Sequence, residues 1–227
     1  DTQALESASE KLKDFNNVKY VHGNHDDIKN ILEDLQIEEV DGILLDLGVS
    51  SYQLDEKNRG FSYLGNNELD MRMDRTNPLS AKVVVNTYTR EQLADIFRKY
   101  GEEDNAWRIA GEIVNNRPLE TTFDIVKITD RVNYKTKGHS AKRVFQALRI
   151  EVNQELKVLE NVLPKAIDLL NVGGRISVIT FHSLEDRIVK QIFNDLSTSC
   201  ICDKRYPCVC NRKQIVKIVN KKPITAS

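Results

Sequence analysis

The sequence lacks a long apolar run, since none of its 227 residues lies in a stretch of the roughly 18 apolar residues that span a membrane. Residues 1–14 do not resemble a secretory leader, because they are acidic and amphipathic. Internal repeats and low-complexity tracts are also absent. The first two absences argue against a membrane-spanning helix and a signal peptide, and the default expectation is a cytoplasmic protein without a membrane partner.

A glycine-rich turn is missing near the start. The chain opens on a helical pattern at residues 2–14, whereas a nucleotide-binding α/β domain normally begins with a strand and a glycine-rich turn. A nicotinamide-dependent dehydrogenase would need a Gly-x-Gly-x-x-Gly turn there, so that alternative has no support. We expect that the natural beginning of the domain is missing and that the chain is truncated at both ends.

Cysteine is absent except at Cys200, Cys202, Cys208 and Cys210. These two Cys-x-Cys pairs could supply four thiolates to one tetrahedral zinc, and cytoplasmic proteins rarely keep disulfides. Against zinc, the usual knuckle is Cys-x-x-Cys, whereas a single intervening residue is the spacing of an extended strand. The sequence leaves both readings open and favours four reduced thiols in a basic loop over a bound zinc.

What the sequence does contain is enough apolar residues for a sizeable core, 40% of the chain, and an uneven distribution of charge. The net charge is only −1, but residues 1–46 carry twelve acids against four lysines, and residues 187–227 carry nine basic residues against two acids. The basic end predicts an anionic partner, with nucleic acid as the obvious candidate. A solvated basic tail is the alternative.

Apolar runs that end in polar residues indicate a parallel sheet. The run Val40–Asp46 ends at a carboxylate, Arg175–Phe181 is followed by His182, and helical patterns precede each run. Val18–Val21 reads as a further short strand. Open α/β sheets bind ligands beyond the carboxyl ends of their strands, so Asp46 and His182 are candidate site residues. The alternative is that Asp46 caps a neighbouring element and that His182 is structural; Ser183 is the expected cap of the helix that follows.

The middle of the chain is helical. From about Pro78 the apolar spacing is that of helices, which predicts a helical insertion without strands. A further helical pattern runs from Ala141 to Leu170, with a break expected at Pro164 and an end at Gly173-Gly174. The three helices expected inside the insertion are Glu91–Tyr100, Asn105–Asn116 and Thr122–Val132.

Seven motifs, in order along the whole chain, resemble those of the RsmH (MraW) family of small-subunit ribosomal RNA methyltransferases. The motifs are Asp41-Gly42-Ile43-Leu44-Leu45-Asp46-Leu47-Gly48-Val49-Ser50-Ser51, Gln53-Leu54-Asp55, Arg59-Gly60-Phe61-Ser62, Leu69-Asp70-Met71-Arg72-Met73-Asp74, Tyr100-Gly101-Glu102-Glu103, Arg143-Val144-Phe145-Gln146-Ala147-Leu148-Arg149-Ile150 with Asn153, and Phe181-His182-Ser183-Leu184-Glu185-Asp186-Arg187.

The resemblance implies an α/β fold with a class I S-adenosylmethionine-dependent methyltransferase (Rossmann-like) sheet and an inserted all-helical domain. The methyltransferase domain would comprise residues 1–77 and 139–227, and the insertion residues 78–138. The implied reaction moves a methyl group from S-adenosylmethionine to the exocyclic N4 of a cytidine in the decoding region of 16S rRNA. The implied partner is the assembled small ribosomal subunit, and the oligomeric state, a dimer included, stays open.

Individual roles follow from the same resemblance. Asp46 and Gln53 match residues that contact the cofactor, and His25 stands where the family usually has an aromatic residue beside the adenine. Asp1 matches the second acid of the family's Ile-Asp-x-Asp turn. Asp46 and His182 are the candidates for accepting a proton from the cytosine amine.

Arg72, Arg143 and Arg149 are the candidates for binding RNA near this site, unless acids such as Asp70 or Asp74 pair with them. The main alternative to an enzyme is a nucleic-acid-binding module with a degenerate methyltransferase fold.

Overall fold

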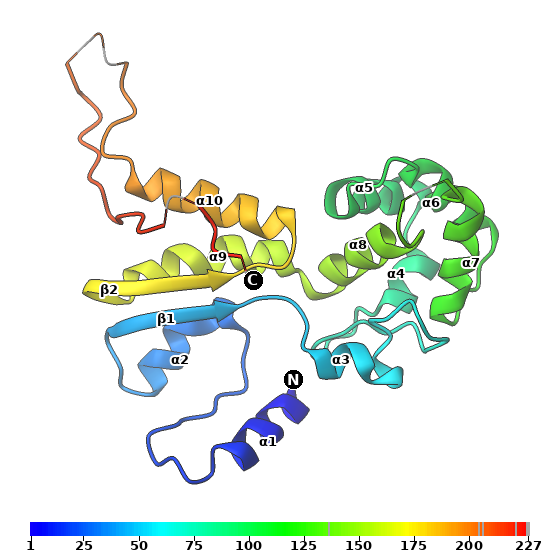
Figure 1. Cartoon of the computed structure of the whole chain (residues 1–227), viewed down its shortest axis with the longest axis horizontal. Helices are drawn as coiled ribbons and strands as arrows, with labels where there is room; N and C mark the ends of the chain where they lie inside the picture. Colours follow the sequence, from blue (N-terminus) through cyan, green and yellow to red (C-terminus); the bar gives the residue numbers. More distant parts are fainter. Residues whose placement is uncertain (136, 204, 206, 221, 226–227) are drawn as a thin grey trace. The chain divides into compact units, whose positions relative to one another are not determined.

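The computed structural model describes residues 1–135, 137–203, 205, 207–220 and 222–225. The chain divides into two compact units, which Figure 1 shows in the colours of the sequence. The first, here the helical unit, comprises Asp1–Gly23 and Gly48–Glu155, and the second, the sheet unit, comprises Asn24–Leu47 and Leu156–Ser227. Each unit has its own cluster of buried apolar side chains.

The sheet unit is built on two parallel strands, β1 (Val40–Asp46) and β2 (Leu170–Ile179). The register runs from Gly42 opposite Arg175 to Asp46 opposite Ile179. This pairing confirms the predicted parallel sheet, and β1 has the predicted bounds. The carboxyl ends of both strands therefore lie side by side at one edge of the sheet (Figure 1).

Helices α2 (Ile28–Asp34), α9 (Glu155–Asp168) and α10 (Ser183–Ser197) supply the remaining apolar side chains of the sheet unit. They pack against the strand face that carries Leu45, with Leu163 of α9 fully buried. The opposite strand face is open, and Leu44 is 65% exposed. Among the described residues, the helices of this unit pack on the face that carries Leu45.

Two boundaries differ from the expectation. Helix α9 ends at Asp168 and β2 begins at Leu170, so Gly173-Gly174 do not end the helix as expected. They lie within β2, where the pairing register shifts opposite residues 40–42. Val18–Val21 forms no strand, because its backbone joins no ladder among the described residues. That segment instead lies near α1, where the Tyr20 hydroxyl donates to the Ala8 carbonyl over 3.4 Å.

The helical unit contains most of the helices. The three helices predicted inside the insertion are confirmed within one residue at each end, and the helices at Ser51–Asp55 and Ala81–Thr87 are additions that the sequence did not indicate. The helices are α1 (Thr2–Lys11), α3 (Ser51–Asp55), α4 (Ala81–Thr87), α5 (Arg90–Gly101), α6 (Ala106–Asn115), α7 (Thr122–Val132) and α8 (Lys142–Asn153).

The break in the long helical pattern lies at Gln154, which ends α8 with a left-handed φ of 53°. The expected break at Pro164 is wrong, because that proline lies inside α9. Helices α5 and α8 make the closest pair in the unit: a Cβ on Gly101 would lie 2.6 Å from the Arg143 carbonyl oxygen, so only glycine permits this approach.

The boundaries of a helical insertion at residues 78–138 stay a prediction, since α8 packs with α5 in the same unit. None of the helices among the described residues is both long and apolar enough to cross a bilayer.

Candidate functional site

The Asp46 carboxylate lies at the carboxyl end of β1, at the edge where the two strands end together. The backbone continues the pairing for one residue, since the Leu47 amide donates to the Ile179 carbonyl over 3.2 Å. Asp46 is exposed, and within the described part of the chain its carboxylate has no hydrogen bond or ion pair. It is therefore a negative charge available to a ligand at the edge where α/β sheets bind them.

His182 follows β2 at the same edge and caps α10. Its Nδ1 accepts the Glu185 amide over 3.4 Å, while the Glu185 carboxylate accepts the amides of Phe181 and His182 over 2.8 and 3.3 Å. The expected cap, Ser183, is wrong by one residue, because the imidazole supplies the acceptor instead of a hydroxyl. The Nδ1 lone pair is thus engaged with the Glu185 amide, and Nε2 lies 3.3 Å from the Glu185 carboxylate. The catalytic role of His182 stays a prediction.

His25 lies on the turn before α2, in the same unit. Its neighbour Asp26 is held by α9, since Lys165 Nζ lies 2.7 Å from the Asp26 carboxylate and Asn161 donates to it over 3.2 Å. Desolvation by surrounding atoms lowers the pKa of His25, although the residue remains accessible, and the Asp26 charge only partly opposes this. The ring is thus neutral at pH 7, which suits stacking on a base; its contact with an adenine stays a prediction.

Gln53 lies in the helical unit and is almost fully buried. It forms a capping box at the start of α3, where its Oε1 accepts the Ser50 amide over 3.0 Å and the Ser50 hydroxyl accepts the Gln53 amide over 3.2 Å. Its Nε2 donates to the Asp1 carboxylate over 2.8 Å. The structure thus joins Gln53, which the resemblance assigned to the cofactor, to Asp1, which matches the second acid of the Ile-Asp-x-Asp turn, through one hydrogen bond.

Arg59 completes this network, and sequence reasoning gave it no role. Its side chain is 2% exposed, and its Nη1 lies 2.9 Å from the same Asp1 oxygen that accepts from Gln53. Its Nη2 donates to the carbonyls of Arg72 and Met73, both over 3.0 Å. The only available signal was its place in the Arg-Gly-Phe-Ser motif, where Gly60 adopts φ 69° and a Cβ would collide with the Glu68 carbonyl.

A shallow groove adjoins this network on the helical unit. It is lined by one face of α1 and by Ser50 and Tyr52 of the loop and helix that follow β1 in sequence. Asp1 also lines the groove, so the Asp1 carboxylate is shared between the buried network and an open surface. The groove offers hydroxyl and carboxylate groups, which can bind a polar ligand.

The three predicted RNA-binding arginines differ in their partners. Arg72 is bidentate to Asp70, with Nε 2.6 Å from the carboxylate, as the alternative reading expected. Arg149 is bidentate to Glu155 over 2.8 and 2.9 Å. Arg143 makes only an exposed pair with Asp104 over 3.2 Å. Arg143 is therefore the member of this set whose charge remains open to a phosphate.

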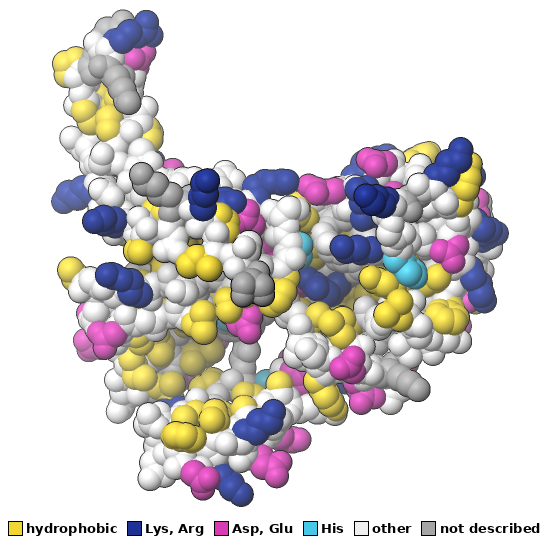
Figure 2. All heavy atoms as spheres, in the orientation of Figure 1, with side chains coloured by type: hydrophobic (Ala, Val, Ile, Leu, Met, Phe, Trp, Pro, Cys, Tyr) yellow, Lys and Arg dark blue, Asp and Glu magenta, His cyan; other side chains and the backbone are white. Residues whose placement is uncertain are grey.

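Further cations lie on both units. Figure 2 shows Lys and Arg side chains (dark blue) spread over the helices of the helical unit and over the segment that follows α10. In that segment Lys213, Lys217 and Lys222 are exposed and have no ion pair within the described part of the chain, whereas Arg212 pairs with Asp195 over 2.8 Å. An RNA role for these cations stays a prediction.

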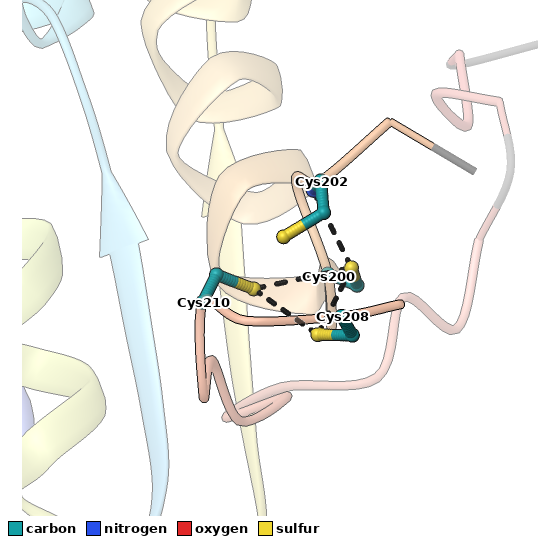
Figure 3. Close-up of side chains that lie close together, drawn as sticks. All are labelled: Cys200, Cys202, Cys208 and Cys210. Carbon is teal, nitrogen blue, oxygen red and sulfur yellow. Dashed lines mark hydrogen bonds between the residues drawn. The ribbon is translucent and has the colours of Figure 1, made fainter. Parts of the chain in front are cut away.

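The four cysteines lie together on the loop that follows α10 (Figure 3). All are free thiols, and their sulfurs lie within 4.8 Å of one another.

The predicted site residues thus fall into two groups. Asp46, His182 and His25 belong to the sheet unit, and Gln53, Arg72, Arg143 and Arg149 belong to the helical unit.

Comparison with known proteins gives the chain a family. A 52% identical relative in Acholeplasma laidlawii (strain PG-8A), named ribosomal RNA small subunit methyltransferase H 1, matches over 231 residues, 100% of this chain and 76% of the relative. Proteins named ribosomal RNA small subunit methyltransferase H in Clostridium botulinum (strain Loch Maree / Type A3) and Finegoldia magna (strain ATCC 29328 / DSM 20472 / WAL 2508) are each 51% identical, again over 100% of this chain and 76% of theirs. The model of the MraW methylase family matches residues 1–227. With a family match over its full length and relatives at half identity, the chain belongs to the MraW methylase family.

Proposed function

We propose that this chain transfers the methyl group of S-adenosylmethionine to the exocyclic N4 of a cytidine in the decoding region of 16S rRNA, within the assembled small ribosomal subunit. The observation that carries the proposal is the exposed Asp46 carboxylate at the carboxyl end of β1, in a chain that matches a methylase family throughout. The class I sheet with an inserted helical domain is part of the same proposal, supported by the parallel β1–β2 pair.

The residues present suit S-adenosylmethionine. That cofactor has an adenine, ribose hydroxyls, a cationic amino-acid end and a sulfonium whose methyl group is activated for transfer. Asp46 offers an uncompensated carboxylate to the cationic part, and the neutral His25 ring offers an aromatic face to the adenine. Within the helical unit, Gln53 and Arg59 hold the Asp1 carboxylate at an open groove.

The methyl transfer requires no covalent intermediate with the protein. A cytosine amino group is a poor nucleophile because its lone pair is delocalised into the ring. A carboxylate that accepts a hydrogen bond from the amine localises that lone pair and receives the proton as the methyl group moves. Asp46 is the better candidate for this role than His182, since the Nδ1 lone pair of His182 is already bound to the Glu185 amide.

Substitution of Asp46 tests the proposal. We expect Asp46→Asn to lower methyl transfer about 100-fold or more, the usual cost of removing a general base. The matched control is Asp41→Asn on the same strand, because Asp41 is also exposed but lies away from the carboxyl end. S-adenosylmethionine binding by calorimetry and transfer of labelled methyl groups to small subunits that lack the modification should be measured separately for both variants.

The outcomes separate the alternatives. Nuclease digestion and mass spectrometry should find N4-methylcytidine at a single position after reaction with the wild type. If Asp46→Asn stays within about twofold of wild type in both binding and transfer, the role of Asp46 is wrong. A protein that binds small subunits but neither binds S-adenosylmethionine nor transfers a methyl group would instead be the non-catalytic nucleic-acid-binding module.

A further inference from the structure

The loop that follows α10 is closed at its base, and its described residues form no apolar core. At the base, the Ile215 amide donates to the Leu196 carbonyl over 2.9 Å, and Arg212 pairs with Asp195. Beyond the base, the apolar side chains point outward, since Ile201 is 68% and Val209 is 81% exposed. Burial of the described apolar side chains therefore does not explain how the two arms stay together.

Cysteine sulfurs fill the inside of the loop instead. In extended chain, residues i and i+2 share one face, so Cys200 with Cys202 and Cys208 with Cys210 each present two sulfurs on the side opposite the intervening apolar residue. Figure 3 shows one pair on each arm of the loop. The Cys-x-Cys spacing, which differs from the usual knuckle, is thus what brings four sulfurs to one point.

The distances among three of the sulfurs are close to the edge of a metal tetrahedron, and the Cys202 sulfur lies within 4.8 Å of each of them. The Sγ atoms of Cys200 and Cys208 lie 3.4 Å apart, those of Cys208 and Cys210 3.6 Å, and those of Cys210 and Cys200 3.9 Å. Four sulfurs at about 2.3 Å from one zinc ion are separated by about 3.8 Å along each edge. A disulfide would require about 2.05 Å, so the cluster is not arranged as two cross-links.

A backbone donor also reaches the cluster, since the Cys202 amide donates to the Cys200 sulfur over 3.4 Å. Such N–H groups stabilise thiolates, which carry excess negative charge when four of them share one divalent ion. The exposed Lys213 lies on the same loop, whereas Arg205 pairs with Asp203 over 2.6 Å.

We propose that Cys200, Cys202, Cys208 and Cys210 form a structural tetrathiolate site for one zinc ion, which holds the two arms of this loop together. All four positions are occupied by protein sulfur, as in zinc sites that stabilise a fold and bind no substrate. The sequence favoured four reduced thiols because Cys-x-Cys is not the usual spacing of a zinc knuckle. In the structure this same spacing brings the four sulfurs together, so we set that preference aside. The inference is independent of the methyl-transfer reaction.

Metal analysis tests the site directly. Protein purified with a reductant and without chelator should contain about one zinc per chain by mass spectrometry of the metal. Replacement by Co²⁺ should give the thiolate charge-transfer band and the intense visible bands of a tetrahedral cobalt–sulfur site. Because the sequence has only these four cysteines, every thiol signal comes from this loop.

Variants then assign the ligands. Cys208→Ser and Cys210→Ser should each lower the zinc retained against a weak chelator about tenfold or more, whereas the control Val209→Ser, between them, should retain it. Circular dichroism of each variant shows whether the rest of the chain is folded. Chelation of wild-type zinc should accelerate trypsin cleavage after Arg205, and added Zn²⁺ should reverse the effect, which tests the site without any substitution.

Two results would overturn the proposal. One is reduced wild-type protein that takes up less than about 0.1 Zn²⁺ or Co²⁺ per chain while all four thiols react rapidly with a disulfide reagent. The other is a pair of disulfides in the purified protein together with no metal uptake after reduction. Either result would show that the four cysteines do not form a metal site.

Discussion

Asn153 joins the end of α8 to the segment that carries the Leu-Asp-Met-Arg-Met-Asp motif, and its removal should destabilise the helical unit. Its Oδ1 accepts the Met73 amide over 2.7 Å, and its Nδ2 donates to the carbonyls of Met71 and Arg149 over 2.8 and 2.9 Å. Met71 is buried and adopts a left-handed φ of 61°, a conformation that non-glycine residues avoid. The side chain of Asn153 therefore holds a strained turn from both sides.

The expected magnitude follows from these contacts. Three hydrogen bonds at about 1 kcal/mol each predict that Asn153→Ala lowers the free energy of unfolding by about 2–3 kcal/mol. Asn153→Asp should cost at least as much at neutral pH, although it keeps the size of the side chain, because its second oxygen would face two carbonyl oxygens instead of donating to them. At a slope of about 2 kcal/mol per molar urea, the midpoint of unfolding should fall by about 1 M.

The single tryptophan makes the measurement specific. Trp107 lies on α6, so its fluorescence during urea unfolding reports the helical unit. The matched control is Asn115→Ala, an exposed position at the end of the same helix, which should change the free energy of unfolding by less than about 0.5 kcal/mol. If Asn153→Ala matches this control, or if Asn153→Asp is as stable as the wild type, the assigned hydrogen bonds do not hold the turn.

Two further predictions concern charge. Arg143→Gln should weaken binding to small-subunit RNA and reduce the salt dependence of log K by about one phosphate contact. Arg149→Gln should mainly lower the stability of the fold, because it removes the bidentate ion pair with Glu155. Equal losses of RNA affinity in both variants would contradict this division. Burial, with the hydrogen bond to Glu151, raises the pKa of Tyr88 to about 12. Since its pKa in the unfolded chain is about 10, this stabilisation is present below pH 10 and lost as the pH rises towards 12, and the difference in urea midpoint between wild type and Tyr88→Phe should shrink over that range; a constant difference would count against it.

The sequence predicted those elements whose pattern is local. Strand β1 has its predicted bounds because an apolar run ends at a carboxylate, and α7 has its predicted bounds because its apolar positions recur at helical spacing. The break at Gln154 was missed because a left-handed residue other than glycine leaves no signal, while Pro164 gave a false one. Val18–Val21 has strand composition, but a strand also needs a partner, which composition does not contain.

For the candidate site, the sequence predicted that Asp46 and His182 lie at the carboxyl ends of strands. It did not predict the hydrogen-bond and ion-pair partners of the site residues. An arginine is available to a ligand only if no carboxylate of the protein already forms a close ion pair with it. Arg72 meets Asp70 two residues away, while Arg143 meets only the exposed Asp104. These pairings depend on how the backbone turns, so the charge pattern alone could not separate a structural cation from a binding one.

The partners of the motif residues indicate which of them are free for chemistry. The Nη1 group of Arg59 donates to Asp1 and its Nη2 group donates to two backbone carbonyls, and Asn153 satisfies both of its polar atoms within the same segment. Gly101 allows two helices to touch. These residues stabilise the helical unit, and a ligand could engage them only by breaking hydrogen bonds that the fold already uses. Asp46 differs, because it lies exposed at the end of β1 and has no such partner within the described residues. A substrate can therefore bind its carboxylate without breaking a hydrogen bond of the fold.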